Sequence, residues 1–211
     1  MDFSAAIFDL DGTLLDSNSV WEKIDIKVLA KRGIRCRSDF AAKLAAMTYE
    51  EAAEEMHKLD VKESTEELIK EFNQLAVQEY RYNIYLKDYA KEYLTYLKSK
   101  GVRTALATAS PKELYEPALR NNHVYKYFDV FCTVGDVGKS KDYPDIYLTA
   151  ASKLGVHPSD CVVFEDVLKG IVSAKNAGMY AVGVYDKYSE EDIITIRAAA
   201  DKFIMNFSEM M

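Results

Sequence analysis

The sequence predicts an α/β protein, with a Rossmann-like parallel sheet core flanked by helices and an inserted domain of four helices. From about Asp88, short apolar segments alternate with helical patterns, which is typical of a parallel sheet covered on both faces. Between residues 17 and 86 the apolar spacing is helical and no clear strand interrupts it. We therefore expect a core made of residues 1–16 and 87–211, and a helical domain made of residues 17–86.

The inserted domain begins with apolar residues at steps of three and four, which predict a helix ending at Gly33. A second short helix is expected after Ser38. Thr48 and Ser64 are each followed three residues later by Glu, the spacing of a capping box, so two further helices are predicted to begin there. We expect the last helix to run to about Tyr85.

The core is expected to contain several short apolar strands, over residues 5–8, 102–108, 130–134, 161–164 and 181–184, with a short final strand over 203–205. Helical patterns separate them, over residues 89–100, 111–121, 144–155, 167–177 and 190–200. In the second of these helices, Pro111 suits the first position, with Ser110 as cap and Glu113 completing a box. Residues 135–143 are expected to form a loop.

Charge and composition narrow the class of protein. The chain has 211 residues and a net charge of −7, which argues against broad attraction to nucleic acid or an anionic membrane. The sequence contains no apolar run near the ~18 residues of a membrane span and no pattern of a signal peptide. Cys36, Cys132 and Cys161 form no CxxC pair and are expected to be reduced. We expect a cytoplasmic monomer.

Two aspartates follow the first apolar segment at a spacing of two residues. Alternate residues of an extended chain point to the same side, so Asp9 and Asp11 are expected to project together beyond the strand. Two like charges this close repel each other unless a cation or a reaction uses them. An Asp-Gly turn is the competing explanation, and it accounts for Asp11 followed by Gly12 but not for Asp9.

Polar residues follow the other predicted strands too, at the edge of the sheet where open α/β folds bind ligands. They are Thr108, Ser110, Lys139, Lys141, Glu165 and Asp166. Carboxylates suit Mg²⁺, and a carboxylate can attack phosphorus to form an aspartyl-phosphate. A second carboxyl can transfer the proton, while a lysine and a hydroxyl can hold the phosphoryl oxygens. The set therefore predicts phosphoryl transfer without a catalytic His or Cys.

With these positions assembled, the sequence resembles the haloacid dehalogenase-like superfamily over essentially its whole length. The matching motifs are DLDGT at residues 9–13, ALAT ending at Thr108, KDYPD beginning at Lys141, and VVFEDVLKGIVSAKNAGM at residues 162–179. In the third motif, Asp142 stands where the family often has proline. The resemblance implies a five-stranded parallel core with a helical cap domain inserted between the first two motifs.

The resemblance also implies roles for individual residues. Asp9 would be the nucleophile and a Mg²⁺ ligand, and Asp11 the general acid and base, with its backbone carbonyl on the metal. Asp166 would be a metal ligand, and Glu165 a ligand directly or through one water. The phosphoryl group would be held by Thr108, Ala109 and Lys141, with Lys139 as the alternative lysine.

Within the superfamily, the carboxylate at Asp11 favours phosphoryl transfer over dehalogenation. The related β-phosphoglucomutase-like mutases typically have a His at the position of Trp21 and a phosphate-binding Arg in the cap loop. This chain has Trp at the first position and no Arg around Thr48 and Tyr49. We therefore predict a phosphatase acting on a small phosphorylated metabolite, with a sugar phosphomutase as the alternative and a non-catalytic binding protein as the third possibility. Substrate specificity is expected in the cap, near Trp21, Met47 and Tyr49.

Overall fold

The computed structural model describes residues 3–45 and 47–211. Its contacts divide the chain into two compact units. The core unit is the segment up to Ser17 together with Tyr85–Met211, and the helical unit is Asn18–Ile84. The two ends of the core that flank the helical unit are joined directly, because the Asp16 amide donates to the Tyr85 carbonyl at 3.0 Å.

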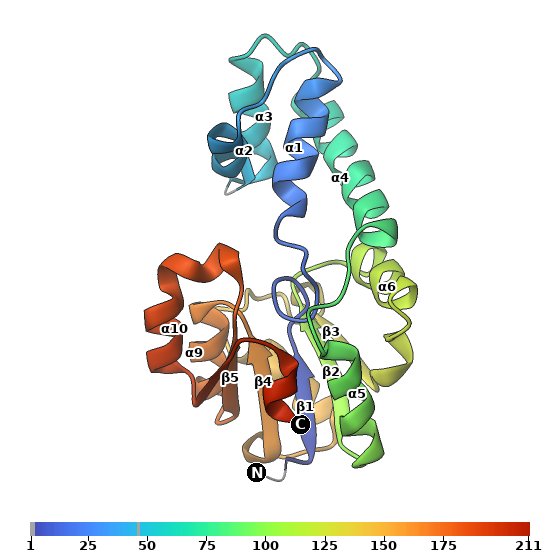
Figure 1. The fold of residues 1–211 in the computed structure, drawn as a ribbon, viewed down its shortest axis with the longest axis vertical. Helices are drawn as coiled ribbons and strands as arrows, with labels where there is room; N and C mark the ends of the chain where they lie inside the picture. The colour runs from blue at the N-terminus through green and yellow to red at the C-terminus, as the bar shows by residue number, and fades with distance from the viewer. Residues whose placement is uncertain (1–2, 46) are drawn as a thin grey trace. The chain divides into compact units, whose positions relative to one another are not determined.

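The core unit is built on a parallel sheet with the strand order β3-β2-β1-β4-β5-β6 (Figure 1). The strands are β1 (Ala5–Phe8), β2 (Arg103–Thr108), β3 (Val130–Thr133), β4 (Cys161–Glu165), β5 (Tyr180–Val184) and β6 (Lys202–Ile204). The predicted α/β class is therefore confirmed. The number of strands implied by the resemblance, five, is wrong. In the part of the chain that the structure describes, the sheet has six strands, because the short strand β6 also pairs with β5.

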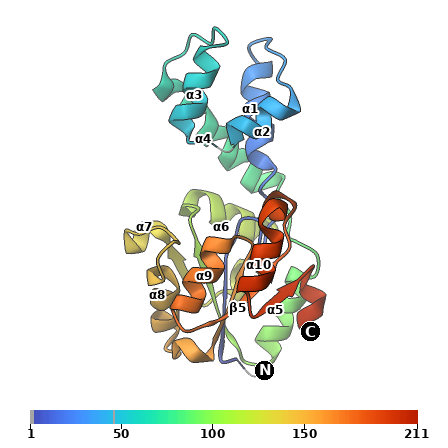
Figure 2. The same cartoon turned by 90° about the vertical axis from the view of Figure 1, so that its left-hand side faces the viewer.

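Helices flank this sheet (Figure 2). They are α5 (Ala90–Ser99), α6 (Lys112–Asn121), α7 (Val134–Val137), α8 (Asp145–Leu154), α9 (Leu168–Asn176) and α10 (Ile193–Ala199). Successive side chains of β1 point to opposite faces of the sheet, so the strand packs against helices on both sides. On one face, Ala5 and Ile7 lie in an apolar cluster with residues of α8, α9 and α10. Phe8 points to the opposite face, where its ring stacks on Phe164 with centroids 4.7 Å apart and contacts Tyr93 of α5.

Three local predictions in the core unit are corrected. The segment expected as a loop begins with the short helix α7, whose first turn is capped reciprocally by Thr133 and Asp136. Ser110 does not cap α6, because the N-cap residue is Pro111 and no side chain caps that helix. Instead, the Ser110 hydroxyl forms a long-range hydrogen bond that is described below. The last helix begins at Ile193 rather than residue 190, after a 3₁₀ segment, Lys187–Asp192.

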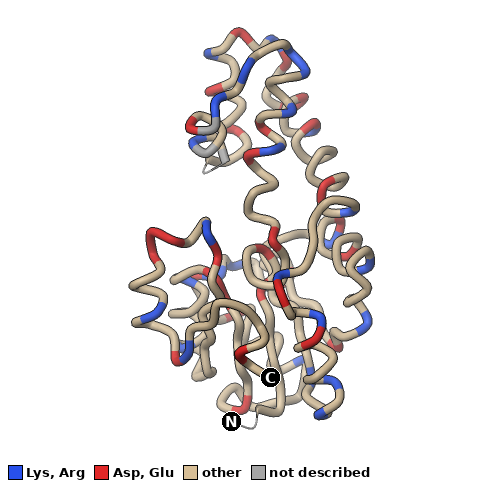
Figure 3. The backbone as a smooth tube through the Cα atoms, in the orientation of Figure 1, with Lys and Arg blue, Asp and Glu red and all other residues tan. Residues whose placement is uncertain are grey.

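The helical unit contains four helices in its described residues: α1 (Val20–Ala30), α2 (Ser38–Ala45), α3 (Tyr49–His57) and α4 (Thr65–Tyr82). Both predicted capping boxes are present, at Thr48 and at Ser64. Acidic and basic residues are interspersed along both units (Figure 3). No helix among residues 3–45 and 47–211 combines the length and the apolar character that crossing a membrane requires.

Candidate active site

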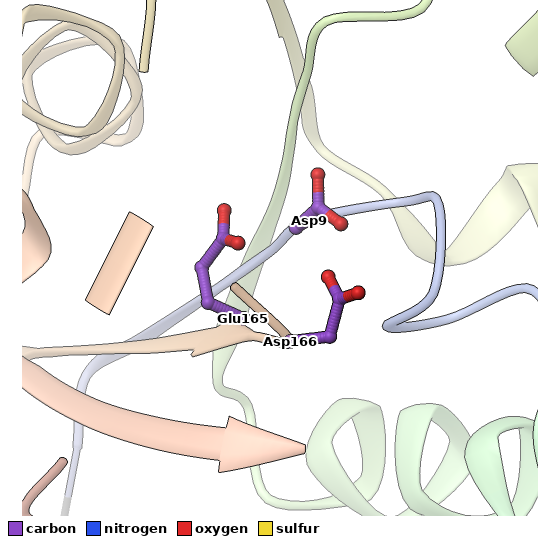
Figure 4. A group of neighbouring side chains, drawn as sticks. All are labelled: Asp9, Glu165 and Asp166. Carbon is purple, nitrogen blue, oxygen red and sulfur yellow. The ribbon is translucent and has the colours of Figure 1, made fainter. Parts of the chain in front are cut away.

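Three buried carboxylates meet at the carboxyl edge of the central strands. Asp9 directly follows β1, Glu165 is the last residue of β4, and Asp166 follows it. The Asp9 amide donates to the Phe164 carbonyl at 3.0 Å, which extends the pairing of β1 with β4 and holds Asp9 beside Glu165. One oxygen from each of the three carboxylates lies within 4.8 Å of the others (Figure 4). The structure thus brings together three of the predicted site residues.

Lys141 lies inside this carboxylate cluster, and Lys139 lies outside it. The Lys141 ammonium is 2.5 Å from Asp9 Oδ1 and also forms an ion pair with Glu165. Lys139 instead forms an ion pair with Asp145 at 2.7 Å, with half of its side chain exposed. Lys141, which the sequence favoured over Lys139, is therefore the lysine placed beside Asp9.

The charges in the cluster perturb one another. Burial opposes the charged form of Lys141, but the carboxylates of Asp9 and Glu165 outweigh it and hold the pKa of the ammonium well above its usual value. Burial raises the pKa of Glu165, although the Lys141 charge acts in the opposite direction. Burial and the negative charges of Asp9 and Glu165 raise the pKa of Asp166 well above its usual value. The cluster therefore has more negative charge than the lysine offsets.

Asp11 lies next to this cluster and is oriented by two hydroxyl groups. Ser17 Oγ donates to Asp11 Oδ1 at 2.7 Å, and Ser110 Oγ donates to Asp11 Oδ2 at 2.6 Å. Gly12 adopts a φ of +79°, a left-handed conformation that favours glycine and lets the chain turn directly after Asp11. Sequence reasoning missed the part that Ser17 and Ser110 play, since the spacing around Ser110 equally fits a helix cap.

Thr108 and Ala109 occupy the end of β2. Thr108 is fully buried, and its hydroxyl oxygen accepts a hydrogen bond from the Ser110 amide at 2.9 Å. Ala109, between them, is exposed. This places a hydroxyl and an exposed stretch of backbone at the same edge of the sheet as Asp9, in the positions predicted to hold a phosphoryl group.

Neighbouring side chains fix the β4 carboxylates. The Tyr147 hydroxyl on α8 donates to Glu165 Oε1 at 2.6 Å, and Thr13 Oγ1 donates to Asp166 Oδ1 at 3.1 Å. A Cβ atom on Gly170 of α9 would lie 2.4 Å from Glu165 Cδ, so only glycine fits against this carboxylate. No sequence signal pointed to Tyr147, which lies in an ordinary amphipathic helix.

The three clustered carboxylates have the character of a site for a hard cation. Glu165 Oε2 is buried and has no hydrogen-bond partner in the described residues. An unpartnered buried carboxylate oxygen is costly unless a cation or a proton compensates it. Mg²⁺ typically takes one or two carboxylates, with waters and substrate phosphate completing its ligands. The residues Asp9, Glu165 and Asp166 therefore fit the magnesium ion that the sequence predicts, while the Asp11 side chain is not part of this group.

The residues predicted to set specificity lie around one cavity of the helical unit, which has a volume of about 340 Å³. Trp21, Met47 and Tyr49 all line it. The other lining residues are Ile24, Asp25, Leu44, Thr48, Ala52 and Phe72. Sequence reasoning missed Asp25, the charged member of this lining.

Comparisons with known proteins identify the family. A profile of haloacid dehalogenase-like hydrolases matches residues 6–184. A validoxylamine A 7'-phosphate phosphatase from Streptomyces hygroscopicus subsp. limoneus is 29% identical over 208 residues, which cover 99% of this chain and 96% of the relative. A phosphorylated carbohydrates phosphatase from Thermotoga maritima is 31% identical over 176 residues, which cover 83% of this chain and 82% of the relative. A solved Thermotoga maritima structure, provisionally assigned as a beta-phosphoglucomutase, matches with a TM-score of 0.87 at 28% identity, covering 95% of this chain and 94% of the other.

The chain belongs to the haloacid dehalogenase-like hydrolases. Within them it is a phosphatase of the β-phosphoglucomutase-like subfamily, which confirms the resemblance and the class of enzyme predicted from the sequence.

Proposed function

We propose that this enzyme hydrolyses the phosphate monoester of a small carbohydrate-like metabolite, with Mg²⁺ as cofactor and an aspartyl-phosphate on Asp9 as intermediate. The observation that carries the proposal is the placement of Asp9. Its carboxylate is buried against Lys141 and beside Glu165 and Asp166, while Asp11 is held nearby by two hydroxyls. A nucleophile, a proton carrier and a positive charge thus occupy one sheet edge.

In the first step, a carboxylate oxygen of Asp9 attacks phosphorus and the bond from phosphorus to the ester oxygen breaks. The departing alkoxide takes a proton from the Asp11 carboxyl. Water then attacks the aspartyl-phosphate, Asp11 accepts its proton, and phosphate leaves with Asp9 restored. Ser17 and Ser110 orient Asp11 for both transfers, because each hydroxyl donates to one of its two oxygens.

The phosphoryl group needs positive charge and hydrogen-bond donors on its oxygens. Lys141 supplies an ammonium beside Asp9, and Thr108 and Ala109 supply a hydroxyl and an amide at the end of β2. Asp9, Glu165 and Asp166 are the side chains that would hold the magnesium ion, with the backbone carbonyl of Asp11. When bound, the ion neutralises phosphate charge and so lets the dianion approach the Asp9 carboxylate.

The names of the relatives support a carbohydrate-like substrate. Those reported above are phosphatases of phosphorylated carbohydrates and of validoxylamine A 7'-phosphate. A third relative, 27% identical over 191 residues, is hexitol phosphatase B from Escherichia coli strain K12. A mutase must hold a second phosphate, and the described residues that line the cavity of the helical unit include no Arg, Lys or His to bind one.

The test is turnover of p-nitrophenyl phosphate with Mg²⁺ by wild type and Asp9→Asn. Removing the nucleophile is expected to lower kcat by about 10⁴-fold or more. Asp142→Asn, on an exposed loop, is the matched control and should keep wild-type activity. Substantial turnover by Asp9→Asn would contradict the mechanism. Phosphorus NMR on a sugar phosphate separates the alternatives, since a phosphatase releases phosphate and a mutase forms an isomer in the presence of a bisphosphate.

A further inference from the structure

The cavity of the helical unit is lined by a buried carboxylate that has no partner among the described residues. Asp25 lies in the middle of α1 and is only 6% exposed. Over residues 3–45 and 47–211, its carboxylate takes part in no hydrogen bond or ion pair. The nearby Lys27 of the same helix is paired with Glu79 instead. Buried carboxylates are normally paired, so Asp25 lacks the group that would offset its charge.

Aromatic rings form much of the cavity wall. The ring centroids of Trp21 and Tyr49 are 5.9 Å apart, and those of Tyr49 and Phe72 are 5.3 Å apart. The face of an aromatic ring is electron-rich and attracts cations, tryptophan most strongly. None of the described residues that line the cavity is positively charged. The lining therefore combines one carboxylate with three rings that all favour a positive guest.

The electrostatic consequences are visible in the titrating groups of the cavity. Burial, with a contribution from the charge of Glu22, raises the pKa of Asp25 to about 7. Burial and the charge of Asp25 raise the pKa of the Tyr49 hydroxyl to about 12. Both shifts have the sign that burial imposes on an acidic group, and no positive charge opposes either of them.

We propose that this cavity binds a small protonated amine such as an amino sugar, with the ammonium group on Asp25 and against the rings of Trp21 and Tyr49. This inference goes beyond the proposed function, because it concerns a binding site within the helical unit. A neutral hydroxyl could donate to Asp25 but would not supply the positive charge that stabilises the ionised carboxylate. The volume, about 340 Å³, is at the lower end of the range for small-molecule sites and suits a fragment of monosaccharide size.

Binding can be measured without catalysis, because Trp21 is the single tryptophan of the chain. Wild-type protein is titrated with glucosamine and, separately, with glucose while tryptophan fluorescence is recorded. We expect a saturable change with glucosamine and binding weaker by about tenfold or more with glucose, since a hydrogen bond to a charged group contributes at least that much. Equal responses to the two sugars, or no response to glucosamine, would overturn the proposal.

Two variants test whether Asp25 is the group that favours glucosamine over glucose. Asp25→Asn preserves the shape of the side chain and should remove the preference for glucosamine. Glu22→Gln, on the same helix but outside the cavity lining, should keep it. Circular dichroism establishes that both variants are folded. A preference that survives in Asp25→Asn would overturn the assignment of Asp25, whereas the comparison of the two sugars on wild type needs no variant.

Discussion

Buried carboxylates occur in both units, but their surroundings differ. In the core unit, Asp9 and Glu165 share Lys141, and Asp166 accepts a hydrogen bond from Thr13. In the helical unit, Asp25 is comparably buried and has no such partner among the described residues. The first arrangement fixes its charges before any ligand arrives, which is the property that electrostatic catalysis requires. The second leaves a charge to be neutralised from outside, which is the property of a recognition site.

Among the variants that test this comparison, the largest effect is expected for Lys141, the positive partner that the core carboxylates have and Asp25 lacks. Lys141→Ala should lower kcat/KM for p-nitrophenyl phosphate by about 10²–10³-fold, because it removes a charge from the developing phosphoryl oxygens. Lys139→Ala should change kcat/KM by less than about twofold, since an exposed ion pair contributes little. Steady-state kinetics of both variants provide the measurement. Equal losses of kcat/KM in the two variants would show that Lys141 has no special role in catalysis.

The second effect is on the pH dependence of stability and isolates Asp25. Because the pKa of Asp25 in the folded protein, about 7, exceeds its unfolded value, the folded state binds more protons between about pH 4 and pH 7. The free energy of unfolding should therefore fall as pH rises through this window, by roughly 2–4 kcal/mol from this group. Urea unfolding at a series of pH values, compared with Asp25→Asn, measures it. An identical slope in the variant would mean that Asp25 is already compensated.

The third effect concerns how closely α9 packs on the core cluster. Gly170→Ala would place a Cβ 2.4 Å from Glu165 Cδ and force that buried carboxylate to move. We expect a loss of about 1–3 kcal/mol in unfolding free energy together with reduced kcat. Gly135→Ala is the control, because its Cβ would meet only the Thr133 hydroxyl at an ordinary 3.5 Å. Unchanged stability in Gly170→Ala would show that the Glu165 side chain can move aside at no cost.

The smallest effect separates two explanations of Ser110. Ser110→Ala should lower kcat by about tenfold, since Asp11 loses one of its orienting hydrogen bonds. Its unfolding free energy should also fall, by about 1 kcal/mol or more, because a hydrogen bond to a charged group is lost. Loss of a helix cap would lower the stability by a similar amount, about 1 kcal/mol, but would leave kcat unchanged. The kcat of this variant therefore distinguishes a positioning residue from a cap.

Ser110 also shows where sequence reasoning stops. Apolar segments, glycines and capping boxes are local signals, and they were sufficient to predict the parallel core, both caps of the helical unit and the strand ends that carry Asp9, Thr108 and Asp166. A hydroxyl that can bond either locally or to Asp11 has no local signal for its choice. The tertiary fold makes that choice by bringing β2 beside β1.

The same limit applies to Asp25. A carboxylate inside an amphipathic helix is normally expected on the solvent face, and only the packing of α1 against its neighbours shows that this one is buried. The choice between Lys139 and Lys141 was different, because the spacing to Pro144 and Asp145 in the third motif already favoured Lys141. The burial of Asp25, by contrast, depends on contacts between segments that lie far apart in the sequence.

The central position of β1 has a consequence for how the protein is made. Its two partners, β2 and β4, follow only after the whole helical unit in the chain. During synthesis, residues 18–84 therefore emerge completely before β1 can pair, and they form a compact unit of their own that can fold first. The apolar segment Ala5–Phe8 must stay unpaired until Arg103–Thr108 has emerged, and in that interval it is an exposed apolar surface that a chaperone can bind.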